Sequence, residues 1–194
     1  MKLGLISDTH GQVPSAVHEA LTGVDHVLHA GDVGSMDVIT ELEAIAPVSA
    51  VLGNTDYGIN LPLSRIEVFA GYKCLIHHIV DLPTPSALLH DLITTEKPKV
   101  IVFGHTHIPY AKQLGGVWFL NPGSACSPRG GSVASVAIAE IENGPASRDV
   151  SAQGRKLRFG RPSAFVTQIQ RCPGVVLWIF DQEHSRAQCQ SQQH

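Results

Sequence analysis

Two histidines, His105 and His107, follow a short β-branched run in the segment KVIVFGHTH. Side chains two positions apart in an extended segment point to the same side. The run Val100–Phe103 has the composition of a buried strand, and it ends at Gly104, a residue at which the chain can turn sharply. Because open α/β sheets bind ligands at the carboxyl ends of their strands, this pair of imidazoles predicts a ligand site there.

Ligand-type side chains also follow other strand-like runs of the chain. They are Asp8 and His10 after 2–7, Asp32 after 25–30, Asn54 and Asp56 after 48–52, and His77 or His78 after 72–76. Asp, Asn and Gly favour turns in any protein, so one such loop has little weight. Three loops in succession at corresponding strand ends favour a shared site.

The combined set of oxygen and nitrogen ligands predicts the kind of metal site. The set is too large for one ion, and it suits two ions about 3.5–4 Å apart that share a carboxylate. It contains no thiolate, which argues against a structural zinc site. We interpret His26 and His29, on or beside a strand, as structural residues outside the ligand set.

The elements that position these loops alternate between strands and helices. Helices are expected over 13–22 and 35–46, between the first three strands, because hydrophobic side chains recur at helical spacing in both. This βαβαβ order predicts a parallel sheet with right-handed crossovers. The later elements are expected as strands 65–69 and 72–76, a helix 84–95, a hairpin of 110–114 and 117–120, and a strand 133–141.

The composition fits one folded domain. The 194 residues are 43% hydrophobic and 16% charged, which excludes an intrinsically disordered chain. Residues 1–147 hold 7 Lys and Arg against 14 Asp and Glu, while 148–194 hold 7 against 3. An acidic body suits a site that neutralises cations, and solubility alone explains it equally well.

The cysteines and the N-terminus indicate the cellular compartment. The four cysteines form no C-x-x-C pair and lie far apart, so we interpret them as reduced thiols of a cytoplasmic protein. The N-terminal segment has no hydrophobic signal-peptide region, and the longest apolar runs are too short to span a bilayer.

These motifs, taken in order, resemble the signature of the calcineurin-like metallophosphoesterase superfamily. D-x-H, G-D, G-N-x-D, a histidine after a strand, and G-H-T-H stand here at 8–10, 31–32, 53–56, 77 and 104–107. The later N-P-G-S at 121–124, with Pro128 and Arg129, is similar to the compact prokaryotic phosphodiesterase branch of that family. The resemblance covers roughly residues 1–143, and it implies an α/β fold in the form of a four-layer αββα sandwich.

The resemblance also implies a role for each ligand. Asp8, His10 and His107 would hold one divalent ion, Asn54, His77 and His105 would hold the other, and Asp32 would bridge the two. Mn²⁺ is the expected ion, with Fe²⁺, Ni²⁺ or Zn²⁺ as alternatives. The ions would clamp a phosphate ester and supply a bridging hydroxide for in-line attack on phosphorus. Asp32 and Asn54 would then be catalytic, Asn54 would also contact the substrate, and Asp56 would accept a hydrogen bond from a ligand.

The resemblance leaves open the roles of four residues. Many relatives have a histidine where this chain has Thr55, so we expect weak activity towards poor leaving groups. Of the neighbours His77 and His78, we favour His77 as the ligand because its spacing after the strand matches the family. His78 would then supply the missing acid or contact phosphate. Arg129 would either approach the substrate phosphate or pair with a nearby acid.

Two units and two functions follow. Residues 1–145 would form the metallophosphoesterase domain, and 146–194 a C-terminal extension. The extension holds a basic cluster at 155–161, which we interpret as solvated because no aromatic platform for nucleic acid accompanies it. A hairpin of 165–170 and 175–180 could extend a sheet edge, and the end after Glu183 is expected to be disordered.

The first function is a metal-dependent phosphodiesterase acting on a small phosphodiester, with no nucleic-acid or membrane partner. The alternative is a non-catalytic protein-interaction scaffold on the same fold, like the retromer subunit related to this family. The intact ligand set favours the enzyme, and a homo-oligomer stays possible.

Overall fold

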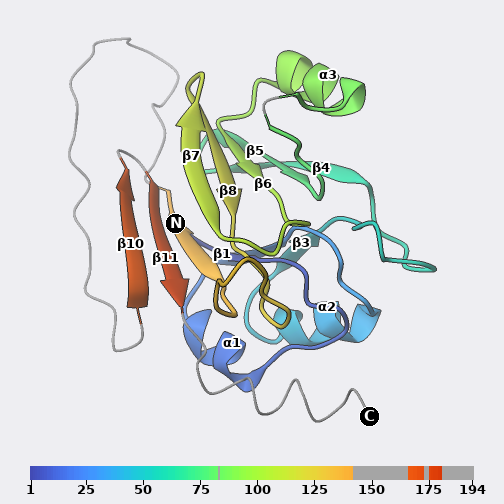
Figure 1. The fold of residues 1–194 in the computed structure, drawn as a ribbon, viewed down its shortest axis with the longest axis vertical. Coiled ribbons are helices and arrows are strands. Elements are labelled where there is room, and N and C mark those ends of the chain that lie inside the picture. The colour runs from blue at the N-terminus through green and yellow to red at the C-terminus, as the bar shows by residue number, and fades with distance from the viewer. Residues whose placement is uncertain (83, 142–165, 173–174, 181–194) are drawn as a thin grey trace.

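The computed structural model describes residues 1–82 and 84–141, together with the backbone of 166–172 and 175–180. Within these residues the chain forms helices and strands in two sheets (Figure 1). The helices are α1 (Ser15–Ala20), α2 (Met36–Glu43) and α3 (Ala87–Glu96). The strands are β1 (Lys2–Ile6), β2 (His26–His29), β3 (Val48–Ala50), β4 (Ser64–Phe69), β5 (Tyr72–His77), β6 (Val100–Val102), β7 (Tyr110–Leu114), β8 (Val117–Asn121), β9 (Ala137–Glu140), β10 (Val166–Cys172) and β11 (Val175–Phe180).

The first sheet contains the predicted βαβαβ unit. Its strand order is β10-β11-β9-β1-β2-β3, and β1, β2 and β3 pair in parallel with α1 and α2 as the crossovers. The second sheet has the order β4-β5-β6-β8-β7, in which β5, β6 and β8 are parallel. In both sheets the parallel strands therefore bring the loops at their carboxyl ends to one edge.

The two sheets pack face to face, and helices cover their outer faces. Side chains of both sheets form the buried layer between them, including Leu5, Leu28, Ile76, Val102 and Leu120. Helices α1 and α2 pack on the first sheet through Val17 and Leu42, and α3 packs on the second through Leu89. The helices accordingly lie at opposite ends of the molecule (Figure 1). The predicted αββα sandwich is confirmed.

Alternation along β5 decides which way its last residues point. Cys74 and Ile76 belong to the layer between the sheets, whereas Leu75 packs on the α3 side with Ile101. Because successive side chains of a strand point to opposite faces, His77 shares the face of Leu75, and His78 the face of Ile76. Burial between the sheets also raises the pKa of the Cys74 thiol to about 12, so this thiol is not reactive.

A chain of polar contacts joins the two sheets at their edge. His26 Nε2 lies 2.9 Å from Ser49 Oγ, and Ser49 donates to Glu67 Oε1 at 3.0 Å. The ring of His26 also packs against Phe69. His26 is therefore a structural residue, as the sequence indicates.

The C-terminal hairpin extends the first sheet. Strands β10 and β11 pair antiparallel, and β11 pairs antiparallel with β9, so the predicted addition to a sheet edge is confirmed. The basic cluster at 155–161 and the end of the chain after Glu183 lie outside the described residues. Among the helices that the structure describes, none has the length and hydropathy needed to cross a membrane.

Candidate metal centre

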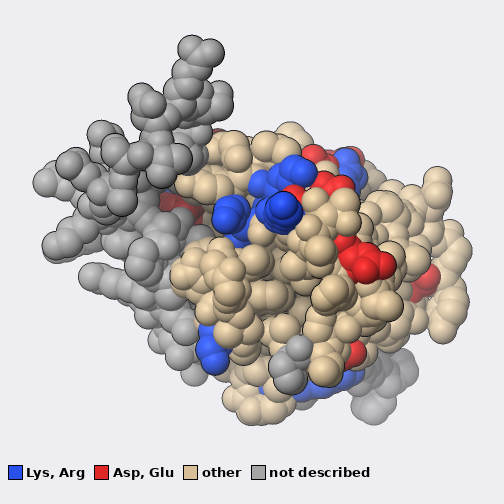
Figure 2. Space-filling view, turned by 90° about the horizontal axis from the view of Figure 1, so that it is seen from above, with Lys and Arg blue, Asp and Glu red and all other residues tan. Residues whose placement is uncertain are grey.

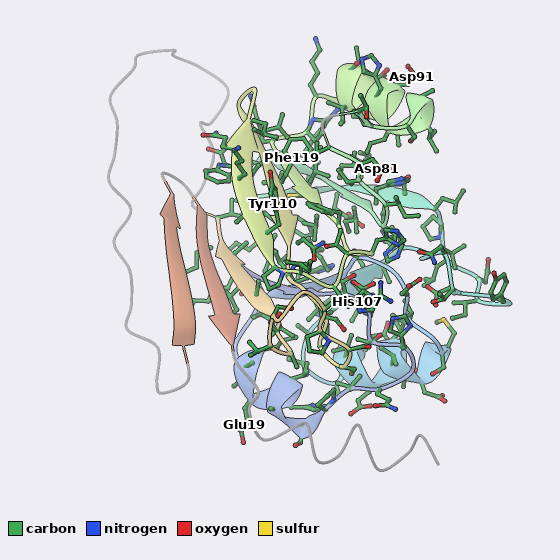
Figure 3. All side chains as sticks on the ribbon, in the orientation of Figure 1. Glu19, Asp81, Asp91, His107, Tyr110 and Phe119 are labelled. Carbon is green, nitrogen blue, oxygen red and sulfur yellow. The ribbon has the colours of Figure 1, made fainter. Side chains whose placement is uncertain are left out.

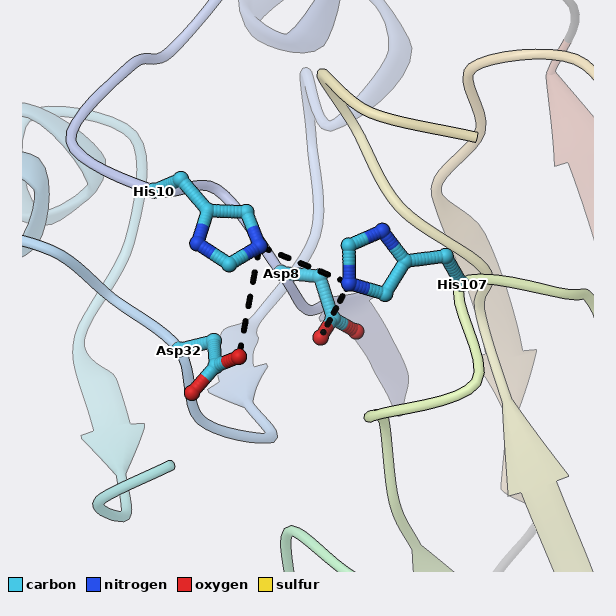
Figure 4. A group of neighbouring side chains, drawn as sticks. All are labelled: Asp8, His10, Asp32 and His107. Atoms are coloured by element: carbon cyan, nitrogen blue, oxygen red, sulfur yellow. Dashed lines mark hydrogen bonds and ion pairs between the residues drawn. The ribbon is translucent and has the colours of Figure 1, made fainter. Parts of the chain in front are cut away.

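Four side chains from three loops meet at the carboxyl ends of the strands. Asp8 and His10 follow β1, Asp32 follows β2 and His107 follows β6, and one ligand atom from each lies within 4.8 Å of all the others (Figure 4). His107 Nε2 is 3.2 Å from Asp8 Oδ1 and 3.4 Å from His10 Nε2. His107 lies in the middle of the molecule, between the strands that carry Tyr110 and Phe119 and the helices α1 and α2 (Figure 3).

A second group of side chains adjoins the first through Asp32. The Asn54 Oδ1 atom lies 2.8 Å from His105 Nδ1 and 3.1 Å from His78 Nε2. Asp32 Oδ1 is 3.4 Å from His78 Nε2, while its other oxygen, Oδ2, is 3.9 Å from His10 Nε2. Each carboxylate oxygen of Asp32 therefore faces a different group, an arrangement that suits a carboxylate shared by two ions.

The structure does not bring His77 to this cluster. Its Nδ1 atom lies 2.7 Å from Ser64 Oγ on the neighbouring strand β4, and burial lowers the pKa of the ring. His78 occupies the place expected for His77, because alternation along β5 turns His78 towards the layer between the sheets. The geometry therefore favours His78 over the expected His77 at the cluster. The alternation of side chains along β5 could have distinguished the two histidines. It does so only once Ile76 is known to face the other sheet.

Hydrogen bonds to backbone carbonyls fix the tautomers of two histidines. His107 Nδ1 donates to the Ser127 carbonyl, and His78 Nδ1 donates to the Ala30 carbonyl at 2.7 Å. A carbonyl oxygen only accepts, so each Nδ1 atom carries a proton, and in the neutral form of each ring the Nε2 lone pair faces the cluster. Around His78 Nε2 these neighbours are oxygens of Asp32 and Asn54. A cation between such groups satisfies all of them, so the residues fit divalent metal ions.

The charges of the cluster fit the same interpretation. Burial raises the pKa of Asp8, and the neighbouring Asp32 carboxylate adds to this effect. Burial acts in the same direction on Asp32, but hydrogen bonds from His78 and the Thr55 backbone outweigh it and hold the pKa of Asp32 below its ordinary value. Burial disfavours charged His78, yet its bonds to Asp32 and Ala30 raise the pKa of His78 overall. The two buried carboxylates therefore stabilise the protonated form of His78 beside them.

The cluster has a buried floor and an open rim. Asp8, Asp32, His78 and His107 are buried, whereas His10 and Asn54 are exposed. A phosphate group can therefore approach the cluster from the side of His10 and Asn54. Substrate access requires such an opening, because a fully enclosed cluster could bind only the ions.

Five of the candidate ligands have a left-handed backbone conformation. The φ angles are 54° at Asp8, 47° at His10, 52° at Asp32, 69° at His105 and 59° at His107. Only two other described residues besides glycine, Ala70 and Lys97, have a positive φ. This conformation costs about 1 kcal/mol for each residue that has a Cβ, and such strain concentrates at functional sites.

The Asp56 carboxylate has a different role from the one we expected. It accepts hydrogen bonds from three backbone N–H groups, those of Val33 at 3.0 Å, Gly34 at 2.7 Å and Gly53 at 2.9 Å. No described ligand side chain donates to it. Asp56 therefore ties the loop of Asp32 to the loop of Asn54, and the hydrogen bond that we expected it to accept from a ligand side chain is not seen among the described residues.

The N-P-G-S segment at 121–124 contacts the loop of Asp8 and His10 and the loop of His105 and His107. Asn121 Nδ2 donates to the Gly104 carbonyl at 2.8 Å and to Thr106 Oγ1 at 3.1 Å. Buried Ser124 donates to the Asp8 carbonyl at 2.7 Å. Residues 121–124 therefore form a turn that organises the loops beside the site.

Arg129 lies next to the site on the loop that supports His107. Its backbone N–H donates to the His107 carbonyl at 3.4 Å, and its side chain is exposed. No ion pair or side-chain hydrogen bond of Arg129 occurs with any residue of the described ranges, so pairing with a nearby acid is not seen there. Its guanidinium group is therefore available to an anion.

A methyl group at position 53 should disrupt the cluster. An added Cβ on Gly53 would lie 2.0 Å from Asp32 Oδ1 and 2.1 Å from the Asp32 backbone nitrogen. Backbone atoms cannot move aside cheaply, so Gly53→Ala must displace Asp32. We expect a loss of Mn²⁺ affinity of roughly 10- to 100-fold by calorimetry, whereas Gly58→Ala, in open space on the same loop but at a φ of 74°, should lower thermal stability only. Equal Mn²⁺ affinity in Gly53→Ala and the parent would contradict this packing argument.

Comparison with known proteins places this geometry among phosphoesterases. The family model described as a calcineurin-like phosphoesterase superfamily domain matches residues 1–144. A probable metallophosphoesterase of Methanothermobacter thermautotrophicus is 41% identical over 137 residues, which are 66% of this chain and 80% of that protein. Phosphodiesterase YfcE of Escherichia coli K12 is 30% identical over 156 residues, 70% of this chain and 85% of that protein. A solved structure of an archaeal phosphodiesterase superposes with a TM-score of 0.60 at 27% identity, covering 72% of this chain and 93% of that chain.

Proposed function

The chain belongs to the calcineurin-like phosphoesterase superfamily, and on this premise we propose that it is a phosphodiesterase that works with two divalent metal ions. The observation that supports the proposal most is the position of Asp32. Its Oδ2 atom faces His10 and its Oδ1 atom faces His78, so a single carboxylate stands between two sets of ligands.

The ligand sets follow from the two groups of side chains. Asp8, His10 and His107 would hold one ion, Asn54, His78 and His105 the other, and Asp32 both. When bound, two such ions neutralise the charge of a phosphate ester and activate water for attack on phosphorus. Imidazole and carboxylate ligands without a thiolate suit Mn²⁺, which we propose as the native ion, ahead of Fe²⁺, Ni²⁺ or Zn²⁺.

The chain's own side chains would bind and orient the ester. The Oδ1 atom of Asn54 faces His78 and His105, which leaves the amide NH₂ group free to donate to a phosphate oxygen. Arg129 offers a cation at the edge of the site. We propose that these two residues bind the phosphate, and that His78 acts through the metal ligand set and not as a general acid.

The leaving group receives little help from this chain. Thr55 supplies a backbone N–H to Asp32 Oδ1 at 2.9 Å, and its hydroxyl group is a much weaker acid than an imidazolium. An ester with a stable leaving group is therefore the preferred substrate. We propose a small phosphodiester, hydrolysed in the cytoplasm. Seen from above, charges of both signs lie side by side on the surface (Figure 2), whereas a nucleic-acid-binding face carries a basic patch or stripe.

The test compares a diester with a monoester. Protein stripped of metal and then supplied with Mn²⁺ should hydrolyse bis-p-nitrophenyl phosphate at least about tenfold faster than p-nitrophenyl phosphate, a difference of roughly 1.4 kcal/mol in the barrier. The stripped protein should be inactive. A faster monoester reaction would overturn the diester assignment. Absence of any turnover, in protein that calorimetry shows to bind two ions, would favour the interaction scaffold.

A further inference from the structure

A buried chain of hydrogen bonds runs through His29, which is not one of the candidate ligands, beside the candidate metal centre. The backbone N–H of Gly31 lies 3.2 Å from His29 Nδ1, and His29 Nε2 lies 2.9 Å from Thr9 Oγ1. Thr9 Oγ1 in turn lies 3.0 Å from the Val33 carbonyl oxygen. His29 and Thr9 are both completely buried, so water does not compete for these bonds.

The direction of every bond in this chain is determined. A backbone N–H can only donate, so His29 Nδ1 accepts, and in the neutral ring Nε2 must then carry the proton. His29 Nε2 therefore donates to Thr9, and the Thr9 hydroxyl donates onward to the Val33 carbonyl. Burial lowers the pKa of His29 to about 3, so the neutral form persists throughout the physiological range.

The chain connects two loops that carry the carboxylates. Thr9 stands between Asp8 and His10, and Gly31 immediately precedes Asp32. We propose that His29 is a positioning residue of the metal centre, which sets the spacing between the Asp8–His10 loop and the Asp32 loop by clamping Thr9 to Gly31. This inference rests on the proposed metal-dependent function.

The spacing needs a clamp because the two loops carry like charges. The carboxylates of Asp8 and Asp32 are both buried, with ligand atoms within 4.8 Å of one another, and they repel one another when no cation lies between them. Backbone bonds also join the loops, from Asp8 to Gly31 at 3.0 Å and from His10 to Asp32 at 3.0 Å. These bonds hold the main chains together, and so the loss of His29 should loosen the ligand geometry without unfolding the sheet.

The test measures metal binding directly, apart from hydrolysis. Calorimetric titration of the metal-stripped full chain with Mn²⁺ should give an affinity roughly 10- to 100-fold weaker for His29→Leu than for the parent. His29→Gln keeps a donor for Thr9 and should recover part of that loss. His26→Gln is the matched control, since His26 lies on the same strand and bonds to Ser49 away from the site.

A double-substitution cycle separates positioning from general damage. Thr9→Val removes the hydroxyl group at nearly constant shape, and it should weaken Mn²⁺ binding about as much as His29→Leu. If the two residues act as one clamp, the double variant loses little more than either single variant. If His29→Leu does not fold, then Thr9→Val and His29→Gln carry the comparison.

The outcomes are distinct. Unchanged Mn²⁺ affinity in the folded His29 and Thr9 variants overturns the inference, and so does an equal loss in His26→Gln. A parent protein that binds Mn²⁺ but cleaves no diester refutes the proposed hydrolysis, while the comparison of affinities still decides the role of His29.

Discussion

Replacement of Asp32 by asparagine should abolish turnover of the diester, with a fall in kcat of about a thousandfold or more. Asparagine keeps the shape of the side chain and an oxygen that can accept the Thr55 N–H. It removes one negative charge and replaces one of the two oxygens by an amide nitrogen, which cannot ligate a cation. A single group can then no longer be shared between the two ligand sets.

The measurement is kcat for bis-p-nitrophenyl phosphate in saturating Mn²⁺, alongside the number of ions bound per chain. Asp37→Asn is the matched control, since Asp37 is an exposed residue in the first turn of α2, and this control should behave like the parent. An Asp32→Asn protein that binds two ions and retains more than about a tenth of the parental kcat would refute the shared-carboxylate assignment.

Two adjacent histidines should differ widely in their effect on activity. His78→Ala removes a ring whose Nε2 atom lies within 3.4 Å of Asp32 and Asn54, so we expect kcat to fall roughly 100- to 1000-fold, with weaker binding of one ion. His77→Ala removes a ring that bonds to Ser64 on the opposite face of β5. We expect its kcat to stay within about threefold of the parent, a change of less than 1 kcal/mol in the barrier.

Each variant serves as the control for the other, because both truncate a histidine at the same strand end. Melting temperatures identify any general loss of stability. The reverse result, in which His77→Ala is inactive and His78→Ala is not, would restore the ligand set that the family spacing implies. If His78→Ala regains activity at high Mn²⁺ concentration, then His78 serves mainly to bind the ion and takes no direct part in the reaction.

The first half of the fold could be predicted because its signals are local. Each of the first three strands is a short apolar run that ends in a polar loop, and each intervening helix has its own hydrophobic spacing. The side chains of Asp8, His10 and Asp32 converge because parallel strands in one sheet place their carboxyl ends together. Those predictions needed no knowledge of contacts between the sheets.

The assignments where the geometry differs from our expectation depend on contacts distant in sequence. The choice between His77 and His78 follows from which face of β5 meets the first sheet, and that depends on Ile76 packing against residues such as Leu28. Two of the three partners of Asp56 are backbone groups of Val33 and Gly34, more than 20 residues away. Side-chain type alone cannot reveal a backbone partner, because every residue except proline presents the same N–H group.

The left-handed backbone at the ligands has a consequence for how such a sequence can change over generations. At His10, His105 and His107 the imidazole occupies a conformation that glycine and asparagine adopt at little cost. A lineage released from the need to bind metal would gain stability by exchanging these histidines for glycine or asparagine. Histidine at all three positions is therefore the expected pattern in relatives that bind metal, and joint replacement of the three would identify relatives that kept the fold and lost the metal site.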